Sequence, residues 1–205
     1  TSREGIGQLT EQAKELGATM AFTASEITGA QIELAKLGFS NDEILSATED
    51  VARFAIIIGA KIPEAAEAAG AAMLSFGLDA TEMDRVTSVL GVGAAKSALD
   101  FEKLKVGIGT TFATAKNFGL EIEDIVALLG ELSNKGLSGS VAATATRNIL
   151  LNLSNAGGKL RKTLDGIGIK EVKGLEGIIT ALQALDGAGV DLNQTFELTD
   201  KRSVN

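Results

Sequence analysis

The chain has 205 residues and a mass of 21.1 kDa, with 45% hydrophobic and 22% charged residues. A chain of this size and composition can bury a core, so wholesale disorder is not expected. The net charge of −8 disfavours general attraction to nucleic acid, because proteins gain that affinity by neutralising phosphates with basic residues. We therefore predict no sequence-specific nucleic-acid partner.

Histidine, cysteine, tryptophan and tyrosine are all absent from the sequence. This excludes a Ser-His-Asp triad, a Cys-His pair, a tetrahedral zinc site and haem or iron–sulfur ligation by the usual donors. We predict no catalytic residue, no metal site and no cofactor. No apolar run approaches the roughly 20 residues of a membrane-spanning helix. The chain begins Thr1-Ser2-Arg3 without a leader pattern, and we interpret it as a fragment.

Apolar residues at helical spacing predict the elements in chain order. The first clear stripe runs over 44–58 and the second over 62–76, where Pro63 suits a first helical turn. Further stripes cover 101–115 and 122–132, and a short helix is predicted through 175–182. These patterns predict an all-α fold, with helices about 12–18 residues long.

Glycine follows an apolar stretch at five places where a left-handed residue is expected to end a helix. The spacings Ser40-x-x-Glu43 and Asp79-x-x-Glu82 predict reciprocal capping of the next helix. The acidic group at 121–124 suits the positive end of another. The five predicted stops are Gly38, Gly59, Gly77, Gly119 and Gly136.

Two interpretations of the overall arrangement remain open. The segments Phe76-Gly77-Leu78-Asp79 and Phe118-Gly119-Leu120-Glu121 nearly repeat one another, 42 residues apart. A helix-hairpin array would repeat about every 40 residues. A compact multi-helix bundle with Gly-punctuated turns is the simpler interpretation. Glycines inside the predicted helices suggest tightly crossing helices or conformational freedom, and these are Gly70, Gly91, Gly93, Gly107, Gly109 and Gly130.

The composition predicts two parts: a helical core module over 1–155 and a Gly-rich, locally basic helical extension over 156–205 that ends in a polar tail. In the extension, Gly157-Gly158-Lys159 lacks the remaining residues of a phosphate-binding loop. We interpret the basic cluster at 159–162 as a solvated helix face rather than a phosphate site. The carboxylates of Glu49-Asp50 and of 121–124 are interpreted as solvated or capping rather than as acid–base pairs.

Three blocks of sequence carry a resemblance to a known family. They are Leu-Ala-Lys-Leu-Gly-Phe-Ser at 34–40, Ser-Phe-Gly-Leu-Asp-Ala at 75–80, and a longer block over 118–147. In this order they resemble the tail tape measure proteins of tailed bacteriophages, in the region of the lactococcal-phage type. The matching residues, predicted as structural motif residues, are Leu34, Lys36, Gly38, Phe39, Ser40, Phe76, Gly77, Leu78, Asp79, Gly119, Leu120, Gly136, Gly139, Ser140, Thr144 and Arg147.

The resemblance implies a structural protein of virion assembly that helps to set tail length and to deliver the genome. It implies tail tube proteins, tail-initiation proteins and tail assembly chaperones as partners, with self-association left open. It places the protein in the virion tail, and in the host cytoplasm during assembly. Within that function we expect the segment to be a helical docking module. The alternatives are a bacterial helical adaptor unrelated to phages and part of a tail-associated cell-wall hydrolase.

Overall fold

The computed structural model describes residues 3–154 and 158–189, and within these ranges the regular structure is entirely helical. This confirms the all-α prediction. A short 3-10 turn, η1 (Ala80–Glu82), precedes α5. The helices are α1 (Arg3–Thr19), α2 (Ala24–Lys36), α3 (Asn41–Ile58), α4 (Ile62–Phe76), α5 (Met83–Lys96), α6 (Phe101–Phe118), α7 (Ile122–Asn134), α8 (Gly139–Ser154), α9 (Lys159–Gly166) and α10 (Gly174–Gly187).

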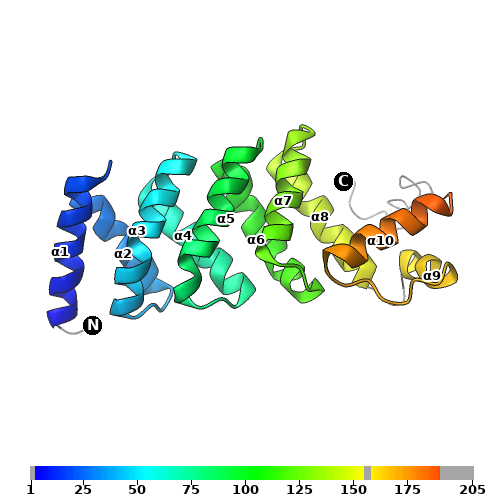
Figure 1. The fold of residues 1–205 in the computed structure, drawn as a ribbon, viewed down its shortest axis with the longest axis horizontal. Helices are drawn as coiled ribbons and strands as arrows, with labels where there is room; N and C mark the ends of the chain where they lie inside the picture. The colour runs from blue at the N-terminus through cyan, green and yellow to red at the C-terminus, as the bar shows by residue number, and fades with distance from the viewer. Residues whose placement is uncertain (1–2, 155–157, 190–205) are drawn as a thin grey trace.

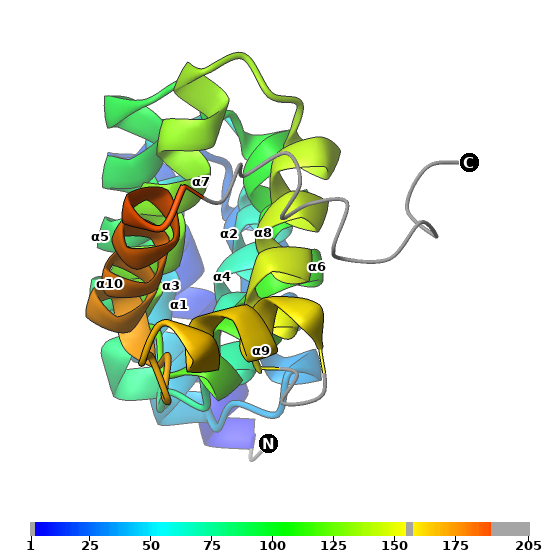
Figure 2. The same ribbon diagram turned by 90° about the vertical axis from the view of Figure 1, so that its right-hand side faces the viewer.

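The first eight helices form two rows (Figure 1). Each helix packs against the helix two places further along the chain, so that α1, α3, α5 and α7 make one row and α2, α4, α6 and α8 the other. Figure 2 looks along the array and shows the two rows side by side, with α10 on the side of the odd-numbered helices. Of the two arrangements left open by the sequence, the structure adopts the helix-hairpin array.

A continuous apolar core fills the space between the rows. Successive helices contribute large, fully buried side chains, among them Phe54 on α3, Phe76 on α4 and Phe112 on α6. The rings of Phe76 and Phe112 meet edge to face, with their centroids 5.4 Å apart. Such a pair adds about 0.5–1.5 kcal/mol to the burial of the two rings. The aromatic contact therefore stabilises the packing of α4 against α6, which are neighbours in the row of even-numbered helices.

The turns from even-numbered to odd-numbered helices share one construction. Gly38, Gly77 and Gly119 all have a positive φ, between 64° and 94°. The apolar residue after each glycine donates its backbone N–H to a carbonyl five residues earlier, as Leu78 does to Met73 at 3.0 Å. This is the Schellman pattern, which satisfies carbonyls that the helix end leaves free. Gly59 and Gly136 also have a positive φ, so all five predicted glycine stops are confirmed.

The two predicted capping boxes have different outcomes. Ser40 and Glu43 cap α3 reciprocally: the Ser40 hydroxyl accepts the N–H of Glu43, and the Glu43 carboxylate accepts the N–H of Ser40 at 2.7 Å. The box predicted for Asp79 and Glu82 is wrong, because the Asp79 side chain makes no capping hydrogen bond there. The intervening residues form a 3-10 turn, and the Glu82 carboxylate instead pairs with Arg85.

Replacing Ser40 by alanine is expected to lower the free energy of unfolding by about 1 kcal/mol, the typical cost of losing a capping hydroxyl. The matched change Asp79→Ala should cost only a few tenths of that amount, since no capping bond is lost. Urea titrations followed by circular dichroism would compare the two variants. Equal losses would contradict the assignment of these caps.

Some glycines inside the helices permit close helix contact, as predicted. A side chain on Gly93 of α5 would collide with Val126 on α7, and a Cβ on Gly107 of α6 would lie 2.6 Å from Leu129 Cδ1. Gly109 is different, because no atom lies within 4 Å of a Cβ built there. The close-packing interpretation is therefore wrong for Gly109, which faces open space on the surface of α6.

Beyond α8, the short helix α9 packs against α8 and α10. The structure forms α10 where a helix through 175–182 was predicted. Arg161 is buried and its guanidinium donates to Asp165 at 2.9 Å, so the interpretation of 159–162 as a solvated face is wrong for this residue. The predicted polar tail over 191–205 and Gly157 lie outside the described residues. None of the described helices is both long enough and apolar enough to span a membrane.

Candidate functional site

The predicted motif residues do not converge on one site. Leu34, Phe76 and Leu120 are buried in the core, while the motif glycines form helix ends. The motif turns at 38–40, 77–79 and 119–121 lie along one edge of the array, the lower edge in Figure 1, and the turn at 136–138 lies on the opposite edge. Apart from the glycines, the exposed members are scattered over several helices and turns, and they are Lys36, Ser40, Asp79, Ser140, Thr144 and Arg147. The motif blocks therefore describe how the hairpins are built.

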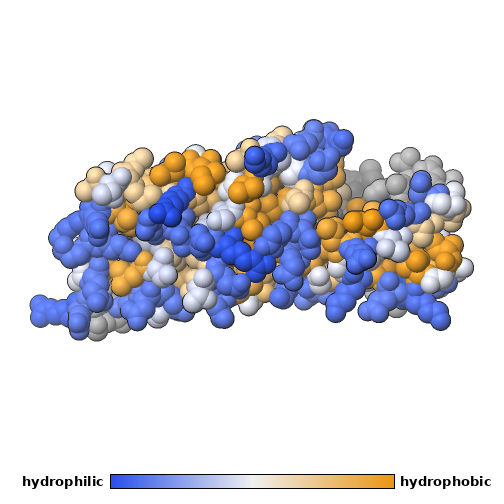
Figure 3. All heavy atoms as spheres, viewed as in Figure 1, coloured by the Kyte–Doolittle hydropathy of each residue, from blue (hydrophilic) through white to orange (hydrophobic). Residues whose placement is uncertain are grey.

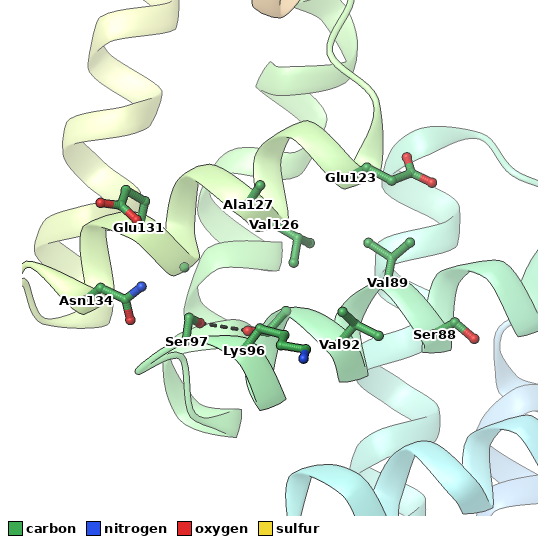
Figure 4. Close-up of a pocket in the computed structure, with 12 residues that line it drawn as sticks. Ser88, Val89, Val92, Lys96, Ser97, Glu123, Val126, Ala127, Glu131 and Asn134 are labelled. Atoms are coloured by element: carbon green, nitrogen blue, oxygen red, sulfur yellow. Dashed lines mark hydrogen bonds between the residues drawn. The ribbon is translucent and has the colours of Figure 1, made fainter.

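An open groove lies between α5 and α7 on the odd-numbered row (Figure 4). Its volume is about 500 Å³, within the usual range of ligand pockets. One wall follows the ridge of Ser88, Val92 and Lys96 on α5, and the other follows Glu123, Ala127 and Glu131 on α7. Residues four apart line each wall because they recur on one face of a helix.

The inner part of the groove is apolar because its lining includes Val89, Gly93, Val126 and Gly130. Gly93 lets α5 and α7 touch directly, so the groove is shallow and open to solvent along its length. Val92 is 57% exposed on the α5 wall. Figure 3 shows apolar side chains gathered between α5 and α7 and again over α10.

Polar contacts join α5 and its following turn to α7 at both ends of the groove. At one end Arg85 of α5 pairs with Glu123 of α7 through two hydrogen bonds, of 2.8 Å from Nε and 2.9 Å from Nη2. At the other end the backbone N–H of Ala98 donates to the Asn134 Oδ1 at 2.8 Å. These contacts fix the spacing of the two helices, and so the width of the groove between them.

The Arg85 guanidinium holds the pKa of the Glu123 carboxyl below its ordinary value of 4.5, chiefly through the hydrogen bond between them. Hydrogen bonds to the carboxylates of Glu123 and Glu82 raise the pKa of Arg85. Because the pKa of Glu123 is lower in the folded chain than in the unfolded chain, the pair contributes its full stability at pH values above the unfolded-state pKa. That stability is lost as pH falls through the pKa of the folded state. The pair therefore remains ionised at neutral pH.

The change Arg85→Met is expected to lower the free energy of unfolding at pH 7 by about 0.5–1 kcal/mol, the range for well-aligned surface ion pairs. The difference from the unchanged chain should shrink as pH falls below 4.5 and then through the lowered pKa of Glu123, where this carboxyl becomes protonated in the folded chain. Urea titrations at pH 7 and pH 3 would measure it. The control is Arg53→Met, since Arg53 pairs with Glu49 within α3 and joins no two helices. A loss independent of pH would contradict this role.

Several of the carboxylates considered as acid–base candidates make capping or ion-pair contacts. Asp124 accepts the backbone N–H of Glu121 at 3.0 Å and so caps α7. Glu49 pairs with Arg53 one turn along the same helix. Burial, together with nearby Asp84, raises the pKa of the Asp50 carboxyl. Of these carboxylates, Glu123 is the one that lines the groove.

The sequence predicts Gly93 and Gly130 as close-packing residues, but it does not indicate the groove. Val89 and Val92 are three residues apart and both line the groove, but the sequence of α5 does not show which helix lies beside this face. The available signal was Val92, an isolated β-branched residue between Ser88 and Lys96 on an otherwise polar face. Val92 can be assigned to a groove only when the position of α7 beside α5 is known.

The two-row array and its open groove define a helical repeat protein, a class that binds through extended surfaces. The sequence profile of the phage-related minor tail protein family matches residues 10–203. The chain belongs to this family, which confirms the resemblance to phage tail proteins drawn from the three sequence blocks.

Two curated relatives are named as tape measure proteins. The tape measure protein of Pneumococcus phage Dp-1 is 28% identical over 166 residues, which is 81% of this chain and 14% of that protein. The probable tape measure protein of Escherichia phage P2 is 31% identical over 165 residues, which is 80% of this chain and 20% of that protein. The chain thus spans a fifth or less of the length of these relatives. No solved structure matches it.

Proposed function

We propose that this chain is a folded module of a longer tape measure protein in a phage tail, and that it acts by binding tail components. The names of the relatives and the small share of their length that the chain spans support this proposal. The family match also argues against an adaptor unrelated to phages. The site of action is the virion tail, reached after assembly in the bacterial cytoplasm.

The two-row array is the main observation in favour of the proposal that this segment docks onto other proteins and that another segment measures length. A ruler gains length as an α-helix at about 1.5 Å per residue, so a fully helical chain of this length would reach roughly 300 Å. Left-handed glycines instead turn the chain back on itself after α2, α3, α4, α6 and α7. The measuring segment would therefore lie elsewhere in the longer protein, and this segment would serve as a docking module.

Small-angle X-ray scattering of the 205-residue chain tests the compact state. We expect a radius of gyration that fits the array, and a rod-like profile would overturn the proposal. A pull-down of tail components with the full-length protein, and with this segment deleted, tests docking. Loss of tail tube or tail-initiation proteins on deletion is expected, whereas unchanged recovery of every component would argue against a docking role.

We propose a structural rather than enzymatic role, since the relatives bear the names of structural proteins. A muralytic assay on the purified chain would test the alternative of a cell-wall hydrolase. We also propose that the core module ends near residue 155, after α8, and that the rest is an extension. Limited proteolysis should then release a stable fragment ending close to that residue.

A further inference from the structure

Helix α10 carries a line of exposed apolar residues in addition to its buried face. Ile178, Ala181 and Leu185 are buried, as expected for a helix at the end of an array. Leu175, Ile179 and Leu182 are exposed by 39%, 46% and 39%, and they follow one another at spacings of four and three residues. That spacing places them on one line of the helix surface, as in helices that lie in apolar grooves.

The line on α10 and the groove between α5 and α7 match in length. Leu175 to Asp186 is a stretch of twelve residues of α10, and Glu123 to Asn134 is a stretch of twelve residues of α7. Both correspond to about 16 Å of helix. The inner lining of the groove offers an apolar surface, formed by Val89, Val126 and Ala127, on which a branched side chain such as Ile179 can pack.

The charges at the two ends also match, for one orientation of the helix. Asp186 lies four residues after Leu182 and so continues the apolar line, and Lys96 lies at the corresponding end of the groove. Within the described part of the chain, neither Lys96 nor Asp186 makes an ion pair. At the opposite end, Glu123 would face the N-terminus of α10, which carries partial positive charge.

We propose that α10 of one copy of this chain lies in the α5–α7 groove of a second copy, parallel to α5 and α7. The contact joins two different surfaces, so one groove and one α10 stay free to bind further copies unless the pairing is reciprocal. Apolar burial supplies the affinity, and the pair Lys96–Asp186 fixes the direction. This inference concerns contact between copies and does not depend on the proposed function in the tail.

The test uses sedimentation of the 205-residue chain over micromolar to millimolar concentrations. The unchanged chain is expected to associate as its concentration rises. Val92→Glu in the groove and Ile179→Glu on α10 should each weaken association by about tenfold or more, because each places a charge in the apolar contact. Val141→Glu and Ile32→Glu are matched controls, since these residues are 52% and 50% exposed outside both surfaces.

Mixing the two deficient variants separates this contact from any other. The Ile179→Glu chain keeps an intact groove and the Val92→Glu chain keeps an intact α10, so the mixture should form a complex of two chains. Lys96→Glu should weaken association, and adding Asp186→Lys should restore it. An unchanged chain that stays monomeric throughout, variants that associate normally, or a mixture that does not associate would each overturn the proposal.

Discussion

Replacing Phe76 by alanine is expected to lower the free energy of unfolding by about 3–5 kcal/mol, the usual cost of removing a buried phenylalanine. The side chain is 1% exposed and its ring packs edge to face on Phe112. Truncation leaves a cavity between α4 and α6 and removes the aromatic contact that joins them. Urea or thermal unfolding followed by circular dichroism would measure the loss.

The matched control for this change is Leu74→Ala, two residues earlier on the same helix. Leu74 is 58% exposed, so its truncation should alter the free energy of unfolding by no more than about 0.5 kcal/mol. A similar loss in both variants would show that α4 does not bury the face seen in the structure. The comparison therefore tests the orientation of α4 as well as the size of the core contribution.

Replacing Gly139 by alanine is expected to cost about 1–3 kcal/mol, the range for forcing extra volume into a packed site. A Cβ at this first residue of α8 would lie 2.7 Å from the Cα of Lys103 on α6. The neighbour is backbone, so a side-chain rotation cannot relieve the collision, and the two helices must separate. Urea titration of the variant would measure the loss.

The change Gly109→Ala, on α6, is expected to raise the free energy of unfolding rather than lower it. A Cβ there meets no atom within 4 Å, and alanine is a better helix former than glycine by up to about 1 kcal/mol. The variant should therefore be more stable than the unchanged chain. Destabilisation by Gly109→Ala, or tolerance of Gly139→Ala, would contradict the packing of α6 described above.

Much of the fold was accessible from local pattern. The glycine stops, the Ser40–Glu43 cap and the position of Pro63 in the first turn of α4 depend on neighbouring residues and backbone conformation. The pattern failed at Asp79 because a 3-10 turn precedes α5, which moves Glu82 to pair with Arg85. It also failed at Arg161, whose burial depends on how the end of the array packs.

The sequence by itself determined the helical class, the five glycine stops and the family, since these are encoded in local residue patterns and in short sequence blocks. The tertiary structure alone decided between bundle and array, because contacts between helices two apart join residues far apart in sequence. It also decided the groove, whose walls come from α5 and α7 and are separated by the whole of α6. The residues of each wall recur every four positions, but nothing within one helix identifies the helix that forms the other wall, so only their packing reveals the groove.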